Sequence, residues 1–198
     1  AHLTGKKGLG IIPINDKSMC KFGAIDIDVY KDLDYESILL KVKSFKLPLY
    51  ACKSKSGGVH LYIFLNEWTS ALIIQTKLKE FAAMLGFGGS EIFPKQTEIL
   101  ADRGDIGQWI NMPYFGDQRW CNGLSPLEFL KQIKKVNIEE LDTIAEPTGD
   151  TFSDGPPCLQ HLAGQGFPAG TRNNGLFNIA VYARKSSPDT WEAEVDKF

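Results

Sequence analysis

Two aspartates one residue apart are the first residues whose types and spacing point to chemistry. Asp26 and Asp28 lie in the segment FGAIDIDVY, where apolar and polar residues alternate as they do in a β-strand. On a strand both carboxylates point to the same side, with Cα atoms roughly 7 Å apart. Carboxylates so placed repel each other unless a cation lies between them, and their oxygens suit Mg²⁺ or Mn²⁺. The alternative is a solvated pair on an edge strand.

A serine- and glycine-rich segment, SKSGGVH, leads into a second expected strand and ends at His60. Glycines let backbone N–H groups approach a phosphate, and hydroxyl, ammonium and imidazole groups add further donors. His60 would share one face of the strand with Tyr62 and Phe64. The alternative is an ordinary glycine turn, with His60 hydrogen-bonded for structural reasons.

A third acidic residue, Glu91, lies in the segment EIFPKQ. Glu91 would complete a three-carboxylate metal site with the aspartate pair, and Lys95 and Gln96 would then reach a triphosphate or a template strand. The alternative is a surface strand that ends at Pro94. Glu91 and Lys95 are four residues apart rather than two, which argues against the Glu-x-Lys spacing of restriction-like nucleases.

Elements that would position these residues follow from periodicity and from capping residues. We expect strands over 8–14, 22–30 and 58–65, with shorter β pieces within 90–112. Helices are expected over 33–46, from Thr69 or Ser70 to about Leu85, and from Ser125-Pro126, where Glu128 follows the capping serine. Residues 158–185 read as helical, broken by GQGFPAG. The pattern predicts an α/β (α+β) fold with a mixed or antiparallel sheet flanked by helices.

Composition excludes several classes of protein. The chain has 198 residues, of which 43% are hydrophobic and 23% charged, as in a globular protein. No apolar run approaches the length of a membrane helix, and no signal peptide is visible, so we expect no membrane partner. Four scattered cysteines argue against a zinc knuckle or a disulfide scaffold and fit the reducing cytoplasm. Because the chain begins at Ala1 rather than Met, we expect a fragment of a longer protein.

The net charge of −2 is unevenly distributed. Residues 1–138 carry 18 Lys and Arg against 14 Asp and Glu, whereas residues 139–198 carry 4 against 10. A basic run without intervening acids comprises Lys41, Lys43, Lys46, Lys53 and Lys55. It fits either a solvated helix face followed by a loop or a phosphate-handling surface, and charge alone does not decide between them.

Taken in order, three motifs resemble those of the archaeo-eukaryotic primase superfamily. They are Asp26-x-Asp28, then SGGVHLY (56–62), then EIFPKQ (91–96) followed by INMPYF (110–115). The similarity is greatest to the primase-polymerase branch of phages and mobile elements, and residues 170–177 resemble the helical segment that follows the catalytic core in phage primase-helicases. Glu91 stands where many members have Asp.

The resemblance implies an RRM-like catalytic palm over residues 1–146, a linker over 147–157, and the start of a helical accessory subdomain over 158–198. It implies template-directed nucleotidyl transfer from an NTP or dNTP to a 3′-hydroxyl, with two Mg²⁺ or Mn²⁺ ions. Asp26, Asp28 and Glu91 would hold the metals, with His60 completing the catalytic set. The incoming nucleotide would contact His60 together with Lys53, Lys55, Ser56, Gly57, Gly58, Lys95 and Gln96.

A single-stranded DNA template is the second partner that the resemblance implies, and a helicase domain in the full-length protein would be a third. Residues expected to hold the template are Arg103, Arg119, Trp120, Arg172 and Asn173. For Trp109 we favour ordinary core packing. Two alternatives remain open: a metal-dependent nuclease that uses the same carboxylates, and a non-catalytic single-strand-binding module of a replication protein.

Overall fold

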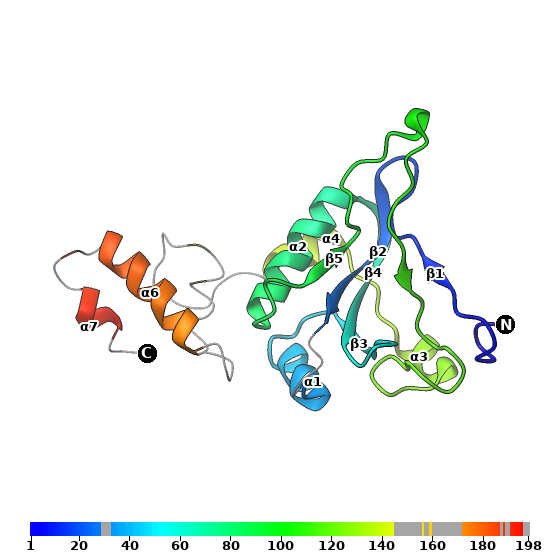
Figure 1. Ribbon diagram of the computed structural model, residues 1–198, viewed down its shortest axis with the longest axis horizontal. Coiled ribbons are helices and arrows are strands. Elements are labelled where there is room, and N and C mark those ends of the chain that lie inside the picture. Colours follow the sequence, from blue (N-terminus) through cyan, green and yellow to red (C-terminus); the bar gives the residue numbers. More distant parts are fainter. Residues whose placement is uncertain are drawn as a thin grey trace.

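A four-stranded antiparallel sheet forms the centre of the structure (Figure 1). The computed structural model describes residues 1–28, 33–144, 156, 159, 172–186, 188 and 191–195. The strands, in spatial order, are β3 (Tyr50–Lys53), β4 (Val59–Ser70), β2 (Met19–Ile27) and β5 (Glu91–Phe93). A second, two-stranded sheet pairs β1 (Gly10–Ile11) with β6 (Ile110–Asn111). With helices flanking both sheets, the expected α+β fold is confirmed.

Two helices cover one face of the large sheet. Helices α1 (Tyr35–Ser44) and α2 (Ala71–Met84) lie on the same side of it in Figure 1. Alternate residues of β2, Ile25 and Ile27, are fully buried against them, in one cluster with Ile38 of α1 and Ile74 of α2. The alternation predicted for β2 is therefore confirmed, with the isoleucines facing the helices and Asp26 facing the other way.

The opposite face of the sheet is covered by β6 and by α3 (Pro126–Gln132). Ala24 and Tyr62 of the sheet pack here with Ile110 of β6 and Phe129 of α3. The start of α3 is held by the capping box expected from Ser125 and Glu128. This covered face is the one that carries Asp26 and His60.

The remaining helices are either short or lie far along the chain after the last strand. They are the 3₁₀ turn η1 (Ala101–Arg103), α4 (Ile138–Ile144), α6 (Arg172–Ser186) and α7 (Trp191–Val195), of which the last two contact each other. Within the described ranges, none of the helices has the length and apolar character to cross a membrane.

Element boundaries differ from the sequence prediction in several places. Strand β4, expected to end at Leu65, runs on to Ser70. Strand β2 begins earlier, at Met19, and the described part ends at Asp28, so Val29 and Tyr30 lie outside the described residues. Strand β3 was not predicted, because its four residues fall inside the basic run and show no alternation. The strand expected over 8–14 reduces to β1, whose two residues are exposed. Ser70 is the N-cap of α2 but makes no side-chain capping bond.

A bulge interrupts the pairing of β2 with β4. Cys20 pairs with Thr69, but Phe22 pairs with Phe64, so residues 65–68 of β4 lie opposite Lys21 alone. The extra residues are held by other contacts: Asn66 N–H donates to the Val136 carbonyl, and the Lys21 ammonium donates to the Asn66 carbonyl. Between Phe22 and Ile27 the register is regular.

Several buried thiol and phenol groups predict a loss of stability at high pH. Burial raises the pKa of the Cys20 thiol to about 12 and also raises the pKa of Tyr35, Tyr62 and Tyr114 above their ordinary values. A hydrogen bond with Cys121, followed by burial, raises the pKa of Cys52. Unfolding above the ordinary thiol pKa of 9.0 therefore releases protons, so stability falls as pH rises. At pH 10 the effect of Cys20 and Cys52 together would lower the free energy of unfolding by roughly 3 kcal/mol.

Thermal unfolding at pH 8 and pH 10 measures this effect. We expect Tm to fall by about 6–12 °C between the two. The Tm of a Cys20→Ala variant should fall less over the same pH interval, because this variant lacks one of the buried thiols. An unchanged Tm from pH 8 to pH 10 would contradict the prediction.

Candidate functional site

Four side chains form a row across the sheet, one from each strand. Cys52 pairs with His60, His60 with Asp26, and Asp26 with Glu91. Directly paired residues of antiparallel strands project from the same face, so the row crosses β3, β4, β2 and β5 in that order. The sheet thus brings together three residues from the three sequence motifs, Asp26, His60 and Glu91.

A chain of polar contacts runs from Asp26 along one face of the large sheet to the two-stranded sheet of β1 and β6 (the β1–β6 ribbon). His60 is buried, with 4% of its surface exposed, and its Nε2 lies 3.1 Å from Oδ1 of Asp26. Its Nδ1 lies 3.2 Å from the Tyr62 hydroxyl, which donates to the Asn111 carbonyl at 2.6 Å. Burial, followed by nearby Cys52, Cys121 and Asp26, raises the pKa of Tyr62, so the hydroxyl remains a donor. These contacts fix the His60 ring in front of Asp26.

Asp26 also borders an acidic pocket. The pocket has a volume of about 320 Å³ and is lined by Asp26, Asp28 and Glu91 together with residues 86–90 of the turn between α2 and β5. Oδ1 of Asp26 is buried, and its contact with His60 does not satisfy the geometry of a hydrogen bond, so it lacks a hydrogen-bond partner among the described residues. A buried carboxylate oxygen without a donor is costly unless a cation or a ligand satisfies it.

Glu91 is engaged by a lysine of its own motif. Lys95 Nζ lies 2.7 Å from Oε2 of Glu91, and both side chains are partly exposed. The backbone of this segment is held from α2, because Gln75 donates to the carbonyls of Pro94 and Lys95. Gln96, expected at the nucleotide, instead accepts a hydrogen bond from the Gln108 backbone.

The carboxylates fit a divalent cation in chemistry, although they do not converge on one point. Within residues 1–28, 33–144 and the described C-terminal stretches, no three His, Cys, Asp or Glu side chains are close enough to hold a metal ion. All three expected ligands nevertheless line one pocket, and Oδ1 of Asp26 is buried with no hydrogen-bond partner in the described part of the chain. Hard oxygen ligands of this kind suit Mg²⁺ or Mn²⁺, while the Lys95 ammonium supplies the positive charge at Glu91.

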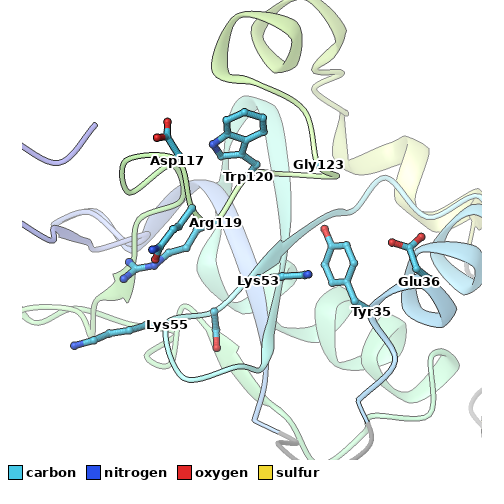
Figure 2. A pocket seen from close by; sticks show the side chains of 10 residues that line it. Tyr35, Glu36, Lys53, Lys55, Asp117, Arg119, Trp120 and Gly123 are labelled. Atoms are coloured by element: carbon cyan, nitrogen blue, oxygen red, sulfur yellow. The ribbon is translucent and has the colours of Figure 1, made fainter. Parts of the chain in front are cut away.

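A larger, basic pocket is lined by residues near the other edge of the sheet, at the end of β3 (Figure 2). Its volume is about 530 Å³. Lys53, Lys55 and Arg119 outnumber the acids Glu36 and Asp117 in its lining. Figure 2 shows Lys53 reaching toward Tyr35, with Nζ 5.1 Å from the ring centroid, while Arg119 and Lys55 extend to the other side. Of the basic run, only Lys53 and Lys55 line this pocket; Lys41 and Lys43 lie in the last turn of α1.

Arg119 and Trp120 carry buried donors without acceptors in this pocket. Nε and Nη1 of Arg119 and Nε1 of Trp120 are buried and have no hydrogen-bond partner within the part of the chain that the structure describes. The guanidinium lies over the Phe115 ring at 4.8 Å. Its charge lowers the pKa of Cys52 and Tyr62, against stronger effects that raise them: the hydrogen bond with Cys121 and burial at Cys52, and burial at Tyr62. Arg119 therefore acts electrostatically on residues of the row and next to it, and its buried N–H groups are donors that an acceptor oxygen would satisfy.

The glycine-rich segment closes a tight turn between β3 and β4. Ser54 N–H donates to the Gly58 carbonyl at 2.8 Å, and Gly57 has φ of 98°. A Cβ on Gly58 would lie 2.3 Å from the Ile27 carbonyl oxygen, so only glycine allows β2 and β4 to approach here. Ser56 contacts Ser54 at 3.3 Å, and neither Ser56 nor the two glycines line the basic pocket.

Other expected site residues lie elsewhere. Arg103 is exposed in η1, and it lines neither the acidic nor the basic pocket. Arg172 and Asn173 begin α6, and their side chains lie outside the described residues. The prediction that Trp109 packs in the core is wrong: 57% of its surface is exposed, because the neighbouring Ile110 takes the core position of β6.

Sequence reasoning missed three contributors to the site. Cys52 joins the row through β3, Gln75 holds the Lys95 segment from α2, and Tyr35 of α1 lines the basic pocket. Gln75 carried one signal, a polar residue among the apolar positions of its helix. Cys52 and Tyr35 carried none, because their roles depend on contacts with distant parts of the chain.

Residues 1–144 match the family model described as the archaeo-eukaryotic primase domain of the TOTE conflict system. The match covers most of the chain, which therefore belongs to this family, as the three motifs indicated. Archaeo-eukaryotic primase domains are in general nucleotidyltransferases, are typically metal-dependent, and bind nucleic acid and nucleotides. A comparison with curated proteins gave no match.

Proposed function

We propose that this domain is a template-directed primase-polymerase that transfers a nucleotide from an NTP or dNTP to a 3′-hydroxyl. The observation that carries the proposal is the row in which Asp26, His60 and Glu91, each from a different motif, are direct neighbours across the sheet. An acidic pocket opens beside the Asp26 and Glu91 positions of the row, and the basic pocket is lined by residues next to its β3 end. Nucleotidyl transfer needs both kinds of environment in one site.

Each pocket has a separate task. Asp26, Asp28 and Glu91 would hold Mg²⁺ or Mn²⁺, which when bound would activate the 3′-hydroxyl and offset the charge of the leaving pyrophosphate. Lys53, Lys55 and Arg119 bind phosphate oxygens, and the unpartnered N–H groups of Arg119 gain acceptors when they do so. With its Nδ1 held at Tyr62, His60 has Nε2, next to Asp26, to donate to a phosphate bound beside that aspartate. In this proposal Arg119 and Trp120 lie at the nucleotide, rather than at the template as expected from the sequence.

Broader features of the biology belong to the same proposal. We place the protein in DNA replication of a phage or mobile element, in the cytoplasm, with a helicase domain elsewhere in the full-length protein. Free, buried Cys20, Cys52 and Cys121 support a reducing compartment. The family match over residues 1–144 supports a catalytic core over 1–146, followed by a linker over 147–157 and an accessory subdomain over 158–198.

Extension of a labelled primer on single-stranded DNA tests the function. We expect products longer than the primer when Mg²⁺ or Mn²⁺ is present with all four dNTPs or NTPs, and the two nucleotide sets report sugar preference. The Asp26→Ala/Asp28→Ala double variant should give no extension under the same conditions. Shortening of the primer would instead identify a nuclease, and DNA binding by a folded protein without either reaction would identify a binding module.

A further inference from the structure

The β1–β6 ribbon is attached to the row of site residues. The carbonyl of Asn111 in β6 accepts the hydrogen bond from Tyr62, whose hydroxyl also contacts His60. In the ribbon, Gly10 pairs with Asn111 and Ile11 with Ile110. Trp109 is the residue immediately before β6, so its position relative to the row is fixed by this short chain of contacts.

The indole of Trp109 packs on the backbone of Gly10. A Cβ built on Gly10 would lie 2.4 Å from Cε3 and 2.8 Å from Cδ2 of the ring, a closeness that only glycine permits. The rest of the residue is open, with 57% of its surface exposed. Since Ile110 is buried at 2% exposure, the alternation along β6 turns Trp109 outward. Glycine therefore supports one side of the indole while much of the residue remains in solvent.

The surroundings of the ring combine apolar surface with positive charge. Exposed apolar side chains lie on the ribbon and on the loop that leads into β6, at Leu9, Ile11, Ile12 and Ile106. Lys6 and Lys7, both exposed, precede β1 in the same segment. An exposed aromatic ring packed on a segment that also carries exposed lysines suits single-stranded nucleic acid, because every base has a π-face and every nucleotide has a phosphate.

We propose that Trp109, supported by Gly10, is a stacking site for an unpaired base of the single-stranded template. The inference rests on the proposed function, since a template must pass close to the row where the 3′-hydroxyl reacts. Stacking on Trp109 holds the strand next to the ribbon without reading its sequence. Lys6 and Lys7, which precede β1, contact phosphates of the same strand and make binding depend on salt.

Binding of a fluorescein-labelled 16-nucleotide oligothymidylate to the full chain tests the proposal. Trp109→Ala should weaken binding by about 5- to 100-fold, whereas Trp109→Phe should retain most of the affinity because it keeps a stacking ring. The matched control is Trp68→Ala, because Trp68 is similarly exposed, at 52%, but lies in the β4 bulge. Trp68→Ala should bind like the wild type.

Three further measurements separate the loss of stacking from general damage to the protein. Gly10→Ala leaves Trp109 in place but forces the ring to move, so it should also weaken binding. The slope of log affinity against log salt should be the same in Trp109→Ala and wild type, because the lost contact is not to phosphate. As a third measurement, nucleotide affinity without DNA should be unchanged in Trp109→Ala and in Gly10→Ala.

The outcomes distinguish this proposal from the proposed function. Wild-type affinity in Trp109→Ala, or equal losses in Trp109→Ala and Trp68→Ala, would overturn the stacking site even if the wild type extends primers. A loss in Trp109→Phe as large as in Trp109→Ala would overturn it too. Weaker binding in Trp109→Ala, with Trp109→Phe and Trp68→Ala unaffected, supports it even if the wild type extends nothing.

Discussion

Asp26→Asn is expected to reduce primer extension on the order of 10³-fold while the protein stays folded. The substitution keeps the shape of the side chain and removes its charge at the position where the row meets the acidic pocket. Oδ1 of Asp26 is buried, lies 3.1 Å from His60 Nε2 and has no hydrogen-bond partner among the described residues. Single-nucleotide incorporation rates and Tm, measured on the same preparation, give the two readouts.

Asp16→Asn is the matched control for that substitution. Asp16 is exposed in the turn that precedes β2, and its loss of charge should leave the incorporation rate unchanged. If Asp26→Asn retained more than about a tenth of the wild-type rate, the carboxylate would not take part in the reaction. A large fall in Tm with Asp26→Asn would instead assign Asp26 a structural role.

Gly58→Ala is expected to damage both the fold and the activity. The added Cβ would lie 2.3 Å from the Ile27 carbonyl oxygen, which is backbone and cannot move without displacing β2. Overpacking of this kind costs about 1–3 kcal/mol, equivalent to a fall in Tm of roughly 3–10 °C. Because Asp26 and His60 pair next to this point, their contact should also open and extension should be lost.

Gly89→Ala provides the comparison for Gly58→Ala. Gly89 lines the acidic pocket, but a Cβ there would meet no atom of the described residues within 4 Å, so Tm should remain near the wild-type value. The steric explanation would fail if Gly58→Ala were as stable and as active as Gly89→Ala.

What the sequence could predict is what depends on neighbours along the chain. The alternation around Ile25 and Asp26 gave the strand and both of its faces, because a side-chain period of two is a local property. The capping box at Ser125 and the end of α2 before Gly86, where φ is 86°, followed in the same way from residue type.

What the sequence could not predict depends on pairing between distant segments. Whether Asp26 faces Glu91, and whether His60 lies between Asp26 and Cys52, is decided by register across four strands. Trp109 was misplaced for the same reason. An apolar residue in an apolar strand predicts burial, but Ile110 takes the core position of β6 and Trp109 packs on Gly10, about a hundred residues earlier.

The bulge opposite Lys21 has a consequence for how this domain can vary in evolution. Residues 65–68 of β4 already lie outside the regular pairing with β2, which resumes at Phe22 opposite Phe64. Insertions or deletions within 65–68 would therefore be absorbed before they reach Asp26 and His60, whereas one residue gained or lost between Phe22 and Asp26 would turn the aspartate into the core. Related chains should accordingly differ in length at the bulge and keep a constant length between Phe22 and Asp26.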